Sequence, residues 1–528
     1  MTPHSSRREL LQLLSVATLT LPMTHAWAQL RPNKNPFGLG VASGSPSSSS
    51  VVLWTRLYDE GFFGTNLPNE NIPLKWEIST DKEFKAIVQQ GQSLAVADLA
   101  HSVHTEVSNL APNTWFYYRF LIGPYTSEVG KTRTFAEPTS NGQKTLKFAF
   151  ASCQHFEHGY FNAYTHLVQE SPDLVLFLGD YIYEYAPGRS GIRLHSGSWC
   201  LSLSDYRKRY EQYKLEPELQ QAHAACPWIF TWDDHEVQND YAGLSSGSFG
   251  PFTNFAKRRA NAYQAYYEHM PLKSSFLVEG LEGLSSGSEL RLYENYQFGK
   301  LANITMLDTR QYRDKQACNP NSQDGSATVS LSSCEQLEDA SRTLLGEKQE
   351  AWLEHQFKNS TAQTWNIIGQ STLFGARVYA TAEGKKVWND GWDGYPVARK
   401  KLTQQLVNHQ VSNPVILGGD VHEYWVGYLK EDYSNSQSKV LGVEFCGTSI
   451  TSNDGKNTAS RQRANPHFIY AEGLRRGYCI VELSEESMTV HLRAVKDITT
   501  RSTEIETLAV FRVSNGSKTI ERLQVGSA

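Results

Sequence analysis

The chain has 528 residues, of which 40% are hydrophobic and 20% charged, and its formal net charge is −5 at pH 7. This length and apolar content are sufficient for two or more folded domains. The slight negative charge gives no electrostatic reason to expect specific nucleic-acid binding, because proteins that bind nucleic acids usually carry a basic surface.

The first 28 residues are typical of a twin-arginine export signal. Arg7 and Arg8 precede an apolar stretch over residues 10–21, and Ala-Trp-Ala at residues 26–28 offers small residues for cleavage. We expect the Tat export machinery to recognise residues 1–28 and to deliver the mature protein to the periplasm or the medium. The alternative is a disordered tail with two adjacent arginines. No later segment approaches the roughly 20 apolar residues that cross a bilayer, so we expect no stable membrane insertion after signal removal.

Residues 36–137 are expected to form a small all-β sandwich domain. Strand-like segments rich in β-branched and aromatic residues occur at residues 50–56, 74–78, 104–107 and 115–120. Turn residues such as Pro112 and Asn113 separate them. We find no group of catalytic residues in this part of the chain.

From residue 146 the pattern changes to strands that alternate with helices, which predicts an α/β domain over residues 146–510. Helical segments are expected at residues 206–219, 255–270 and 346–358, and core strands at 302–308, 365–369 and 415–419. Two polar stretches, residues 186–198 and 318–333, are expected to be surface insertions that could border a substrate entrance. Residues 511–528 are expected to form a C-terminal tail.

Seven cysteines in an exported protein predict disulfides and one thiol left over. Cys153, which follows an apolar strand, is the expected free thiol. The expected pairs are Cys318–Cys334, which would close a loop rich in Asn, Ser and Gly, Cys200–Cys226 and Cys446–Cys479. The sequence alone does not determine this connectivity.

Two short acidic motifs each follow a continuous apolar run. Gly179-Asp180-Tyr181-Ile182-Tyr183 follows residues 173–178, and Gly418-Gly419-Asp420-Val421-His422 follows residues 414–417. Continuous apolar runs are expected of strands that are covered on both faces. The ends of two such strands can converge, so the two motifs predict one site.

Asp180 and Tyr183 stand three residues apart at a strand end. This spacing can direct both side-chain oxygens to one cation where the chain turns immediately after the strand. Tyrosinate is a hard anionic ligand that favours iron(III), and a carboxylate such as Asp180 can bridge two cations. A purely structural role for the pair is the alternative.

Residues 230–240 place four acids, a histidine and two amides directly after an apolar segment. Carboxylates this close together repel one another and raise one another's pKa values unless cations neutralise them. A solvated surface segment is the alternative. Within this segment, Asp233 is expected to support Asp234 rather than to bind metal itself.

Together and in this order, the motifs resemble those of the PhoD-like alkaline phosphatase family, a group of metallophosphoesterases whose site is related in design to that of purple acid phosphatases. The matching segments are residues 41–44 (VASG), 52–56 (VLWTR), 151–154 (ASCQ), 180–183 (DYIY), 232–236 (WDDHE), 307–313 (LDTRQYR) and 418–422 (GGDVH). The resemblance covers nearly the whole mature chain. It implies an α/β domain with a central two-sheet β-sandwich flanked by helices, preceded by the small all-β sandwich domain.

The resemblance also implies an iron(III) ion and neighbouring calcium ions. The implied iron ligands are Cys153, Asp180, Tyr183 and His422, and the implied calcium ligands are Asp180, Asp234 and Asp420. A thiolate is a softer donor that suits iron, whereas carboxylate oxygens suit calcium. Asn239 is expected to give its carbonyl to calcium, to hold substrate, or to cap a turn.

Three further side chains and one loop near the motifs have expected roles. His235 is expected to donate a hydrogen bond to phosphate or to protonate the leaving group, or else to support the metal ligands. Asp308 and Arg310 are expected to form an internal ion pair. Residues 389–396 resemble a family loop that lies near the site.

The function predicted is that of an exported hydrolase of the alkaline phosphatase D type. It would cleave phosphomonoesters and phosphodiesters with hydroxide generated on iron(III), while calcium holds the phosphate oxygens and Asp180 bridges the cations. A phosphodiesterase or phospholipase D-like enzyme with the same metal cluster is one alternative. A noncatalytic exported binding protein stabilised by its metals is the other.

Overall fold

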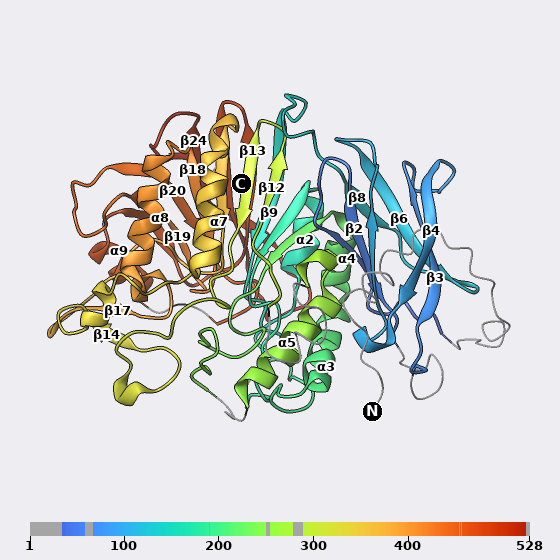
Figure 1. The fold of residues 1–528 in the computed structure, drawn as a ribbon, viewed down its shortest axis with the longest axis horizontal. Helices are drawn as coiled ribbons and strands as arrows, with labels where there is room; N and C mark the ends of the chain where they lie inside the picture. The colour runs from blue at the N-terminus through green and yellow to red at the C-terminus, as the bar shows by residue number, and fades with distance from the viewer. Residues whose placement is uncertain are drawn as a thin grey trace.

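The computed structural model describes residues 34–58, 67–189, 191–249, 254–277, 289–453, 455 and 457–523. Within these ranges the chain forms two large sheets that pack on each other, with helices outside them and a β-rich region at the N-terminal end (Figure 1). The expected export signal, residues 1–28, lies outside the described residues. No helix in the described part of the chain is long and apolar enough to cross a membrane.

The larger sheet has ten strands. In spatial order they are β25 (Glu521–Leu523), β24 (Ile505–Ser514), β23 (Ser487–Val495), β22 (Arg476–Ser484), β9 (Thr145–Ala151), β10 (Leu174–Leu178), β11 (Trp228–Thr231), β1 (Val41–Gly44), β2 (Val51–Arg56) and β5 (Ser102–Val107). Its centre is parallel, because β10 pairs in parallel with both β9 and β11. The carboxyl ends of these three strands therefore lie at the same edge.

The second sheet has seven strands. In spatial order they are β12 (Glu294–Phe298), β13 (Ala302–Met306), β15 (Trp365–Gly369), β18 (Pro414–Gly418), β20 (Val440–Cys446), β19 (Tyr424–Lys430) and β21 (Phe468–Glu472). The run from β13 through β15 and β18 to β20 is parallel. A three-stranded sheet of β14 (Thr328–Ser330), β17 (Gly384–Trp388) and β16 (Tyr379–Thr381) lies apart from both.

Strand β10 shows why its apolar run is continuous. All five of its residues are buried. Leu174, Leu176 and Leu178 pack into the core between the two large sheets, whereas Val175 and Phe177 pack into the core beneath the helices on the other face. Because both faces are covered, no polar alternation is needed. This confirms the interpretation of the run as a doubly covered strand.

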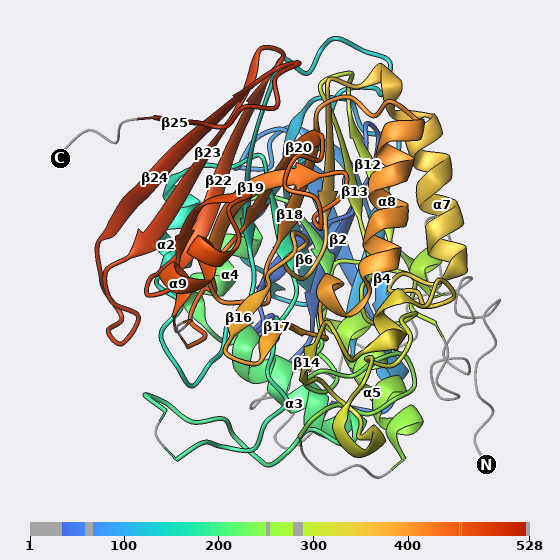
Figure 2. The same cartoon turned by 90° about the vertical axis from the view of Figure 1, so that its left-hand side faces the viewer.

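Helices cover the outer face of each large sheet (Figures 1 and 2). The ten-stranded sheet carries α2 (Ala163–Gln169), α3 (Leu203–Lys214), α4 (Pro217–Ala225) and α5 (Phe255–His269). The seven-stranded sheet carries α7 (Glu347–Lys358) and α8 (Pro396–Asn408), while α9 (Thr458–Ala464) contacts β21. The helix-flanked two-sheet core expected from the sequence is therefore confirmed.

The single helix expected over residues 206–219 is two helices. α3 begins earlier, where Ser202 and Asp205 form a reciprocal capping box. It ends at Lys214, and α4 starts at Pro217, the first position of the new helix. Proline has no backbone N–H to give to a preceding turn, so it starts helices and interrupts them.

The N-terminal region is a β-sandwich joined to the rest of the molecule through a shared sheet. Its own sheet consists of β4 (Ile87–Ala95), β3 (Ile72–Ser79), β6 (Trp115–Ile122) and β7 (Tyr125–Thr126), with β8 (Gly130–Arg133) paired to β6. It packs on β1, β2 and β5 through a core that includes Leu53, Trp76 and Tyr118. β1 meets β11 in parallel at Gly44, where a Cβ would stand 2.5 Å from the Pro271 carbonyl oxygen.

Residues 511–528 are expected from the sequence to form a C-terminal tail, and this expectation is wrong for residues 511–523. β24 continues to Ser514 and β25 adds the last strand at the sheet edge, which Figure 2 shows. Phe511, Val513 and Ile520 are buried in the core between the sheets. Alternate apolar residues in this segment therefore cover the end of that core.

One of the three expected disulfides is confirmed. Cys318 and Cys334 are bonded, with their Cα atoms 5.8 Å apart. The other two expected pairs are wrong, because Cys200, Cys226, Cys446 and Cys479 are buried free thiols. Each of these four fills space in an apolar core, and Cys446 and Cys479 belong to different cores.

Candidate metal centre

The site lies where the parallel strands of both large sheets end. In five strands, β9, β10, β11, β13 and β18, the second residue after the strand is a potential ligand or acid: Cys153, Asp180, Asp233, Asp308 and Asp420. The same offset places these residues at one edge of the two-sheet core. The expected convergence of the two acidic motifs is thus observed.

The backbone turns sharply at the residues that face the site. Cys153, Asp180, Asp420 and His422 all have positive φ angles, between 55° and 65°. This left-handed region costs a residue other than glycine roughly 1 kcal/mol or more. Four such residues at one place indicate that the surrounding structure holds the side chains against local preference.

Glycines allow the loops at the strand ends to pack closely. A Cβ on Gly179, whose φ is 107°, would stand 2.5 Å from the Asp233 Cβ atom. A Cβ on Gly419 would stand 2.4 Å from the Ser152 hydroxyl oxygen. The backbone N–H of Cys153 also donates to the Gly179 carbonyl at 3.0 Å. Glycine is therefore needed directly before Asp180 and Asp420, because a side chain there would block the approach of the neighbouring loops.

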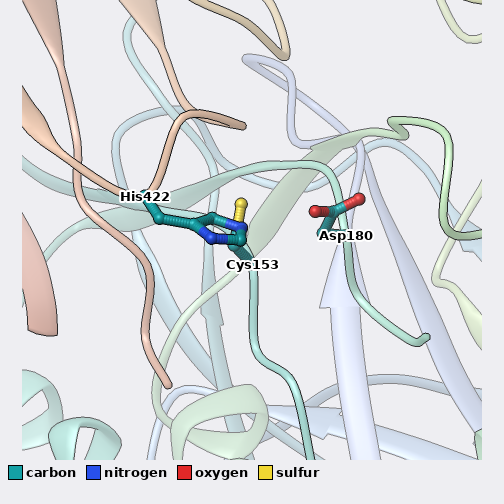
Figure 3. A group of neighbouring side chains, drawn as sticks. All are labelled: Cys153, Asp180 and His422. Atoms are coloured by element: carbon teal, nitrogen blue, oxygen red, sulfur yellow. The ribbon is translucent and has the colours of Figure 1, made fainter. Parts of the chain in front are cut away.

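The four predicted iron ligands lie together. Ligand atoms of Cys153, Asp180 and His422 are within 4.8 Å of one another, and Figure 3 shows the three side chains as neighbours. The Tyr183 hydroxyl donates to Asp180 Oδ2 at 2.8 Å and lies 3.4 Å from His422 Nε2. A thiol, a carboxyl, a phenol and an imidazole thus converge.

Asp180 also belongs to a second group. One of its oxygens, a carboxylate oxygen of Asp234 and a ring nitrogen of His235 lie within 4.8 Å of one another. Asp180 Oδ1 and Asp234 Oδ1 are buried and accept no hydrogen bond in the structure. Buried carboxylate oxygens without a donor are costly, and cations would satisfy them. The residues present therefore fit metal ions.

The electrostatic state of the site agrees with this fit. Burial raises the pKa values of Cys153, Asp180 and Asp420 well above their usual range, and neighbouring carboxylates raise them further. Burial, followed by the charge of Asp180, likewise raises the pKa of Tyr183. These groups hold their protons unless positive charge replaces them, so metal binding here must release protons.

Two predicted ligands are already in the form that binds metal. Burial, and then the charge of Arg476, lowers the pKa of His422 to about 3, so its imidazole is neutral. Although burial raises the pKa of Asp234, Arg310 and His235 hold it well below its usual value. A neutral imidazole and an ionised carboxylate are ready to bind a cation.

His235 is held by a buried acid. Its Nδ1 lies 2.8 Å from Glu184 Oε2, and Glu184 is fully buried. Burial alone lowers the pKa of His235, but Asp234, Asp180 and Glu184 raise it well above its ordinary value. Because Nδ1 is turned to Glu184, Nε2 is the ring nitrogen left to interact with a substrate.

Asp420 and Asn239 each accept a hydrogen bond from a neighbouring hydroxyl. Asp420 Oδ2 accepts a hydrogen bond from Thr372 Oγ1 at 2.7 Å, and Asp420 belongs to neither group of ligand atoms described above. The Asn239 side-chain carbonyl accepts a hydrogen bond from the Tyr185 hydroxyl at 2.7 Å. Each carbonyl or carboxylate oxygen retains a second lone pair for a further interaction.

The expected Asp308–Arg310 ion pair is wrong. Asp308 Oδ1 accepts the backbone N–H of Arg310 at 2.9 Å, whereas the Arg310 guanidinium bonds to Asp233 and, at 2.6 Å, to Asp390 Oδ2. Asp390 also pairs with Arg313 at 2.6 Å. The loop at residues 389–396 thus reaches the site through Arg310.

Sequence reasoning missed His155 and Ser452. The ring of Tyr183 contacts the rings of His155 and His235, with 4.2 Å and 4.1 Å between the ring centroids. Ser452 places its Oγ 2.7 Å from the Tyr183 hydroxyl. His155 lies directly after the Ala-Ser-Cys-Gln segment, which is a signal in the sequence, but Ser452 is 269 residues from Tyr183 and carries none.

Acids, histidines, a thiol and a phenol at the carboxyl ends of a helix-flanked two-sheet core define the site of a metallophosphoesterase. Comparison with known proteins agrees. Residues 148–492 match the family model of PhoD-like phosphatases, and residues 24–136 match the model of that family's N-terminal domain. The chain belongs to the PhoD-like phosphatase family and is a phosphoric ester hydrolase.

Individual phosphatases are similar to this chain in sequence or in fold. The chain is 42% identical over 488 residues to alkaline phosphatase D of Bacillus subtilis (strain 168), an alignment that covers 90% of this chain and 80% of that protein. A solved structure of PhoD matches with a TM-score of 0.86 and 39% identity over 94% of each chain. The purple acid phosphatase PPD1 of yellow lupin (Lupinus luteus) has a TM-score of 0.52 at 10% identity, covering 90% of this chain and 73% of that one, and shares the fold.

Proposed function

We propose that this phosphatase is an exported enzyme of the alkaline phosphatase D type that hydrolyses both phosphomonoesters and phosphodiesters with iron(III) and calcium. The observation that carries the metal assignment is the position of Asp180. It belongs to two groups of ligand atoms, and its buried Oδ1 accepts no hydrogen bond. A carboxylate in this position suits a shared ligand between two cations.

The two groups differ in chemistry. Cys153, Asp180, Tyr183 and His422 combine a thiol, a phenol and an imidazole with a carboxylate, a set that suits a transition metal such as iron(III). In the second group, the carboxylates of Asp180 and Asp234 would suit calcium, a hard cation, whereas His235 would remain the proton donor. Asp420 and Asn239, which lie outside both groups, would add further oxygen ligands for calcium. When bound, these cations would act as Lewis acids toward water and toward the phosphate oxygens.

The chain's own groups would bind the substrate and move the proton. His235 would donate its Nε2 proton to the oxygen of the leaving group, while Glu184 holds the other side of the ring. Asp180 would fix the spacing of the two cation sites because it contributes to both. The Arg310 ion pairs would keep Asp233, and with it the neighbouring Asp234, in place.

Export is supported by separate features. The N-terminal arginine pair, apolar stretch and cleavage site occur in the order of a Tat signal. The Cys318–Cys334 disulfide suits an oxidising compartment such as the periplasm or the extracellular medium. Cell fractionation of the full chain and of Arg7→Lys/Arg8→Lys tests this part: the double variant should stay in the cytoplasm, and unchanged export would contradict Tat recognition.

Hydrolysis of a monoester and a diester by the purified mature protein tests the catalytic part. Turnover of 4-nitrophenyl phosphate and bis(4-nitrophenyl) phosphate should be lost with a calcium-selective chelator and return when calcium is added. Elemental analysis of the same preparation should find iron that the chelator leaves behind. Chelator-resistant turnover, or the absence of iron from fully active protein, would contradict the metal assignment.

A further inference from the structure

Two aromatic side chains continue the site outward from His235. The Tyr185 ring meets the His235 ring edge to face, with 5.1 Å between centroids, and Trp199 meets Tyr185 in the same way at 5.3 Å. Both side chains are half-buried, whereas the other neighbours of His235 named above, Tyr183, Glu184, Asp180 and Asp234, are buried. Tyr185 and Trp199 therefore present accessible aromatic surface next to the proton donor.

The position of Trp199 is fixed relative to His235. The Glu184 side chain bonds to His235, and the Glu184 backbone carbonyl accepts the N–H of Cys200 at 2.9 Å. On the other side, Arg209 donates to the Ser198 carbonyl at 3.2 Å. The residues before and after Trp199 are thus both anchored, and one of these anchors is the residue that orients His235.

The Tyr185 ring is also held in place. Its hydroxyl donates to the Asn239 side chain at 2.7 Å, and the Asn239 backbone N–H donates to Glu184 Oε1 at 2.9 Å. Because the hydroxyl is already hydrogen-bonded, the part of Tyr185 left for a ligand is its apolar ring. Fixed aromatic rings next to each other favour a planar aromatic partner, which packs edge to face or offset against them.

We propose that Tyr185 and Trp199 bind the leaving group and select phosphate esters whose alcohol carries a planar aromatic ring. The inference rests on the proposed role of His235 as donor to the leaving-group oxygen. The carbon atoms bonded to that oxygen must lie within van der Waals distance of what borders His235. The Tyr183 side faces the proposed metal ligands and the Glu184 side is buried, so the leaving group extends along Tyr185 toward Trp199.

The test compares two substrates whose leaving alcohols have similar acidity, benzyl phosphate and ethyl phosphate. Trp199→Ala should lower kcat/KM for benzyl phosphate by about 5-fold, the scale of a single aromatic contact, mainly through a higher KM. The kcat/KM of Trp199→Ala for ethyl phosphate should differ from that of the wild type by less than about 2-fold. Trp199→Phe should recover most of the kcat/KM that Trp199→Ala loses on benzyl phosphate. Equal losses on both substrates, or no loss on benzyl phosphate, would overturn the proposal.

The matched control is Trp352→Ala. Trp352 is also half-buried and packs against one tyrosine, Tyr293, at 4.9 Å, but it lies on α7 outside the seven-stranded sheet. This variant should leave the benzyl-to-ethyl ratio of the wild type unchanged. A change as large as that of Trp199→Ala would show that the ratio reports general destabilisation, and it would overturn the proposal.

A binding measurement separates this inference from the proposed reaction. Calorimetry with benzylphosphonate and ethylphosphonate, which are not hydrolysed, should show tighter binding of the benzyl compound to the wild-type holoenzyme and equal binding to Trp199→Ala. Wild-type protein that binds both phosphonates but hydrolyses neither ester would contradict the catalytic proposal alone. Equal affinity of the wild type for the two phosphonates would contradict the leaving-group site alone.

Discussion

The buried carboxylate of Glu184 contacts His235, with its Oε2 atom 2.8 Å from Nδ1 of the imidazole. The other oxygen of the same carboxylate accepts the backbone N–H of Asn239 at 2.9 Å. One buried acid therefore sets both the orientation of His235 and the position of the loop beside it. Its negative charge also contributes to the raised pKa of His235.

Glu184→Gln should weaken proton donation by His235. The loss of the Glu184 charge lowers the pKa of His235, so the proton is lost at lower pH and the alkaline limb of the kcat/KM profile shifts down. We expect a loss of about 10- to 100-fold on benzyl phosphate, the range for removing a group that orients a catalytic or metal-binding histidine. Rate measurements from pH 6 to 11 check this.

The contrast with an activated ester is the control. 4-Nitrophenyl phosphate has a leaving group that needs little protonation, so Glu184→Gln should affect it much less. Equal losses on both esters with an unshifted pH profile would mean that Glu184 only stabilises the loop.

Asp180 and Tyr183 should differ in their effect on metal content. Because Asp180 belongs to both groups of ligand atoms, Asp180→Asn should lower iron and calcium together and reduce turnover by more than about 100-fold, beyond the range for residues that only support ligands. Tyr183→Phe should lower iron and remove the tyrosinate-to-iron absorption band while calcium stays bound. Elemental analysis and visible spectra of the purified variants measure both. Calcium loss in Tyr183→Phe equal to that in Asp180→Asn would contradict two distinct sites.

His104 should make the protein less stable in acid. It is buried where β5 meets α5, stacks on Tyr267 at 4.3 Å, and places its Nδ1 3.2 Å from the Leu272 carbonyl. Burial lowers its pKa to about 4 from 6.5. Between these two values the unfolded chain binds a proton that the folded chain does not, so stability falls as the pH falls from 6.5 to 4, by about 3 kcal/mol.

His104→Phe keeps the ring stacking and removes the titration. Urea unfolding at several pH values should show that the wild type loses about 3 kcal/mol more than this variant between pH 6.5 and 4. His355→Phe, at an exposed position on α7, should keep the wild-type pH dependence. Parallel curves for wild type and His104→Phe would contradict the assignment.

The parts of the site predicted from the sequence are those that depend on local order along the chain. A continuous apolar run followed two residues later by Asp180 or Asp420 identifies a doubly covered parallel strand and a side chain at its carboxyl end. Parallel strands bring such ends together, so convergence follows from the pattern. The disulfide Cys318–Cys334 was also predictable, because its partners flank one short loop.

What the sequence did not show depends on contacts between distant segments. Arg310 pairs with Asp233 and Asp390, which are 77 and 80 residues away, and the nearby Asp308 that the sequence suggested is instead bonded to backbone N–H groups. In the same way, Cys446 and Cys479 looked like a pair, but the two-sheet arrangement places them in different cores. Packing between elements decides such cases, and spacing along the chain does not encode it.

The Arg310 network allows a test of how the site is supported. Arg310 is almost completely buried and bonds to Asp233 and Asp390, with Asp234 at 3.7 Å. Arg310→Met would leave these acids buried without their partner. Breaking a buried ion pair in this way costs about 3–5 kcal/mol, measured by urea unfolding.

A second substitution separates loss of the network from loss of packing. Asp390→Asn removes one of the acids that Arg310→Met leaves uncompensated. The double variant should therefore be more stable than Arg310→Met alone by about 1 kcal/mol or more. Asp390→Asn by itself should be destabilising, because Arg310 and Arg313 lose their partner. Additive effects of the two substitutions would show that Arg310 contributes through packing of its side chain. Recovery of stability in the double variant would show that the positive charge of Arg310 stabilises the site by offsetting the charges of Asp233, Asp234 and Asp390.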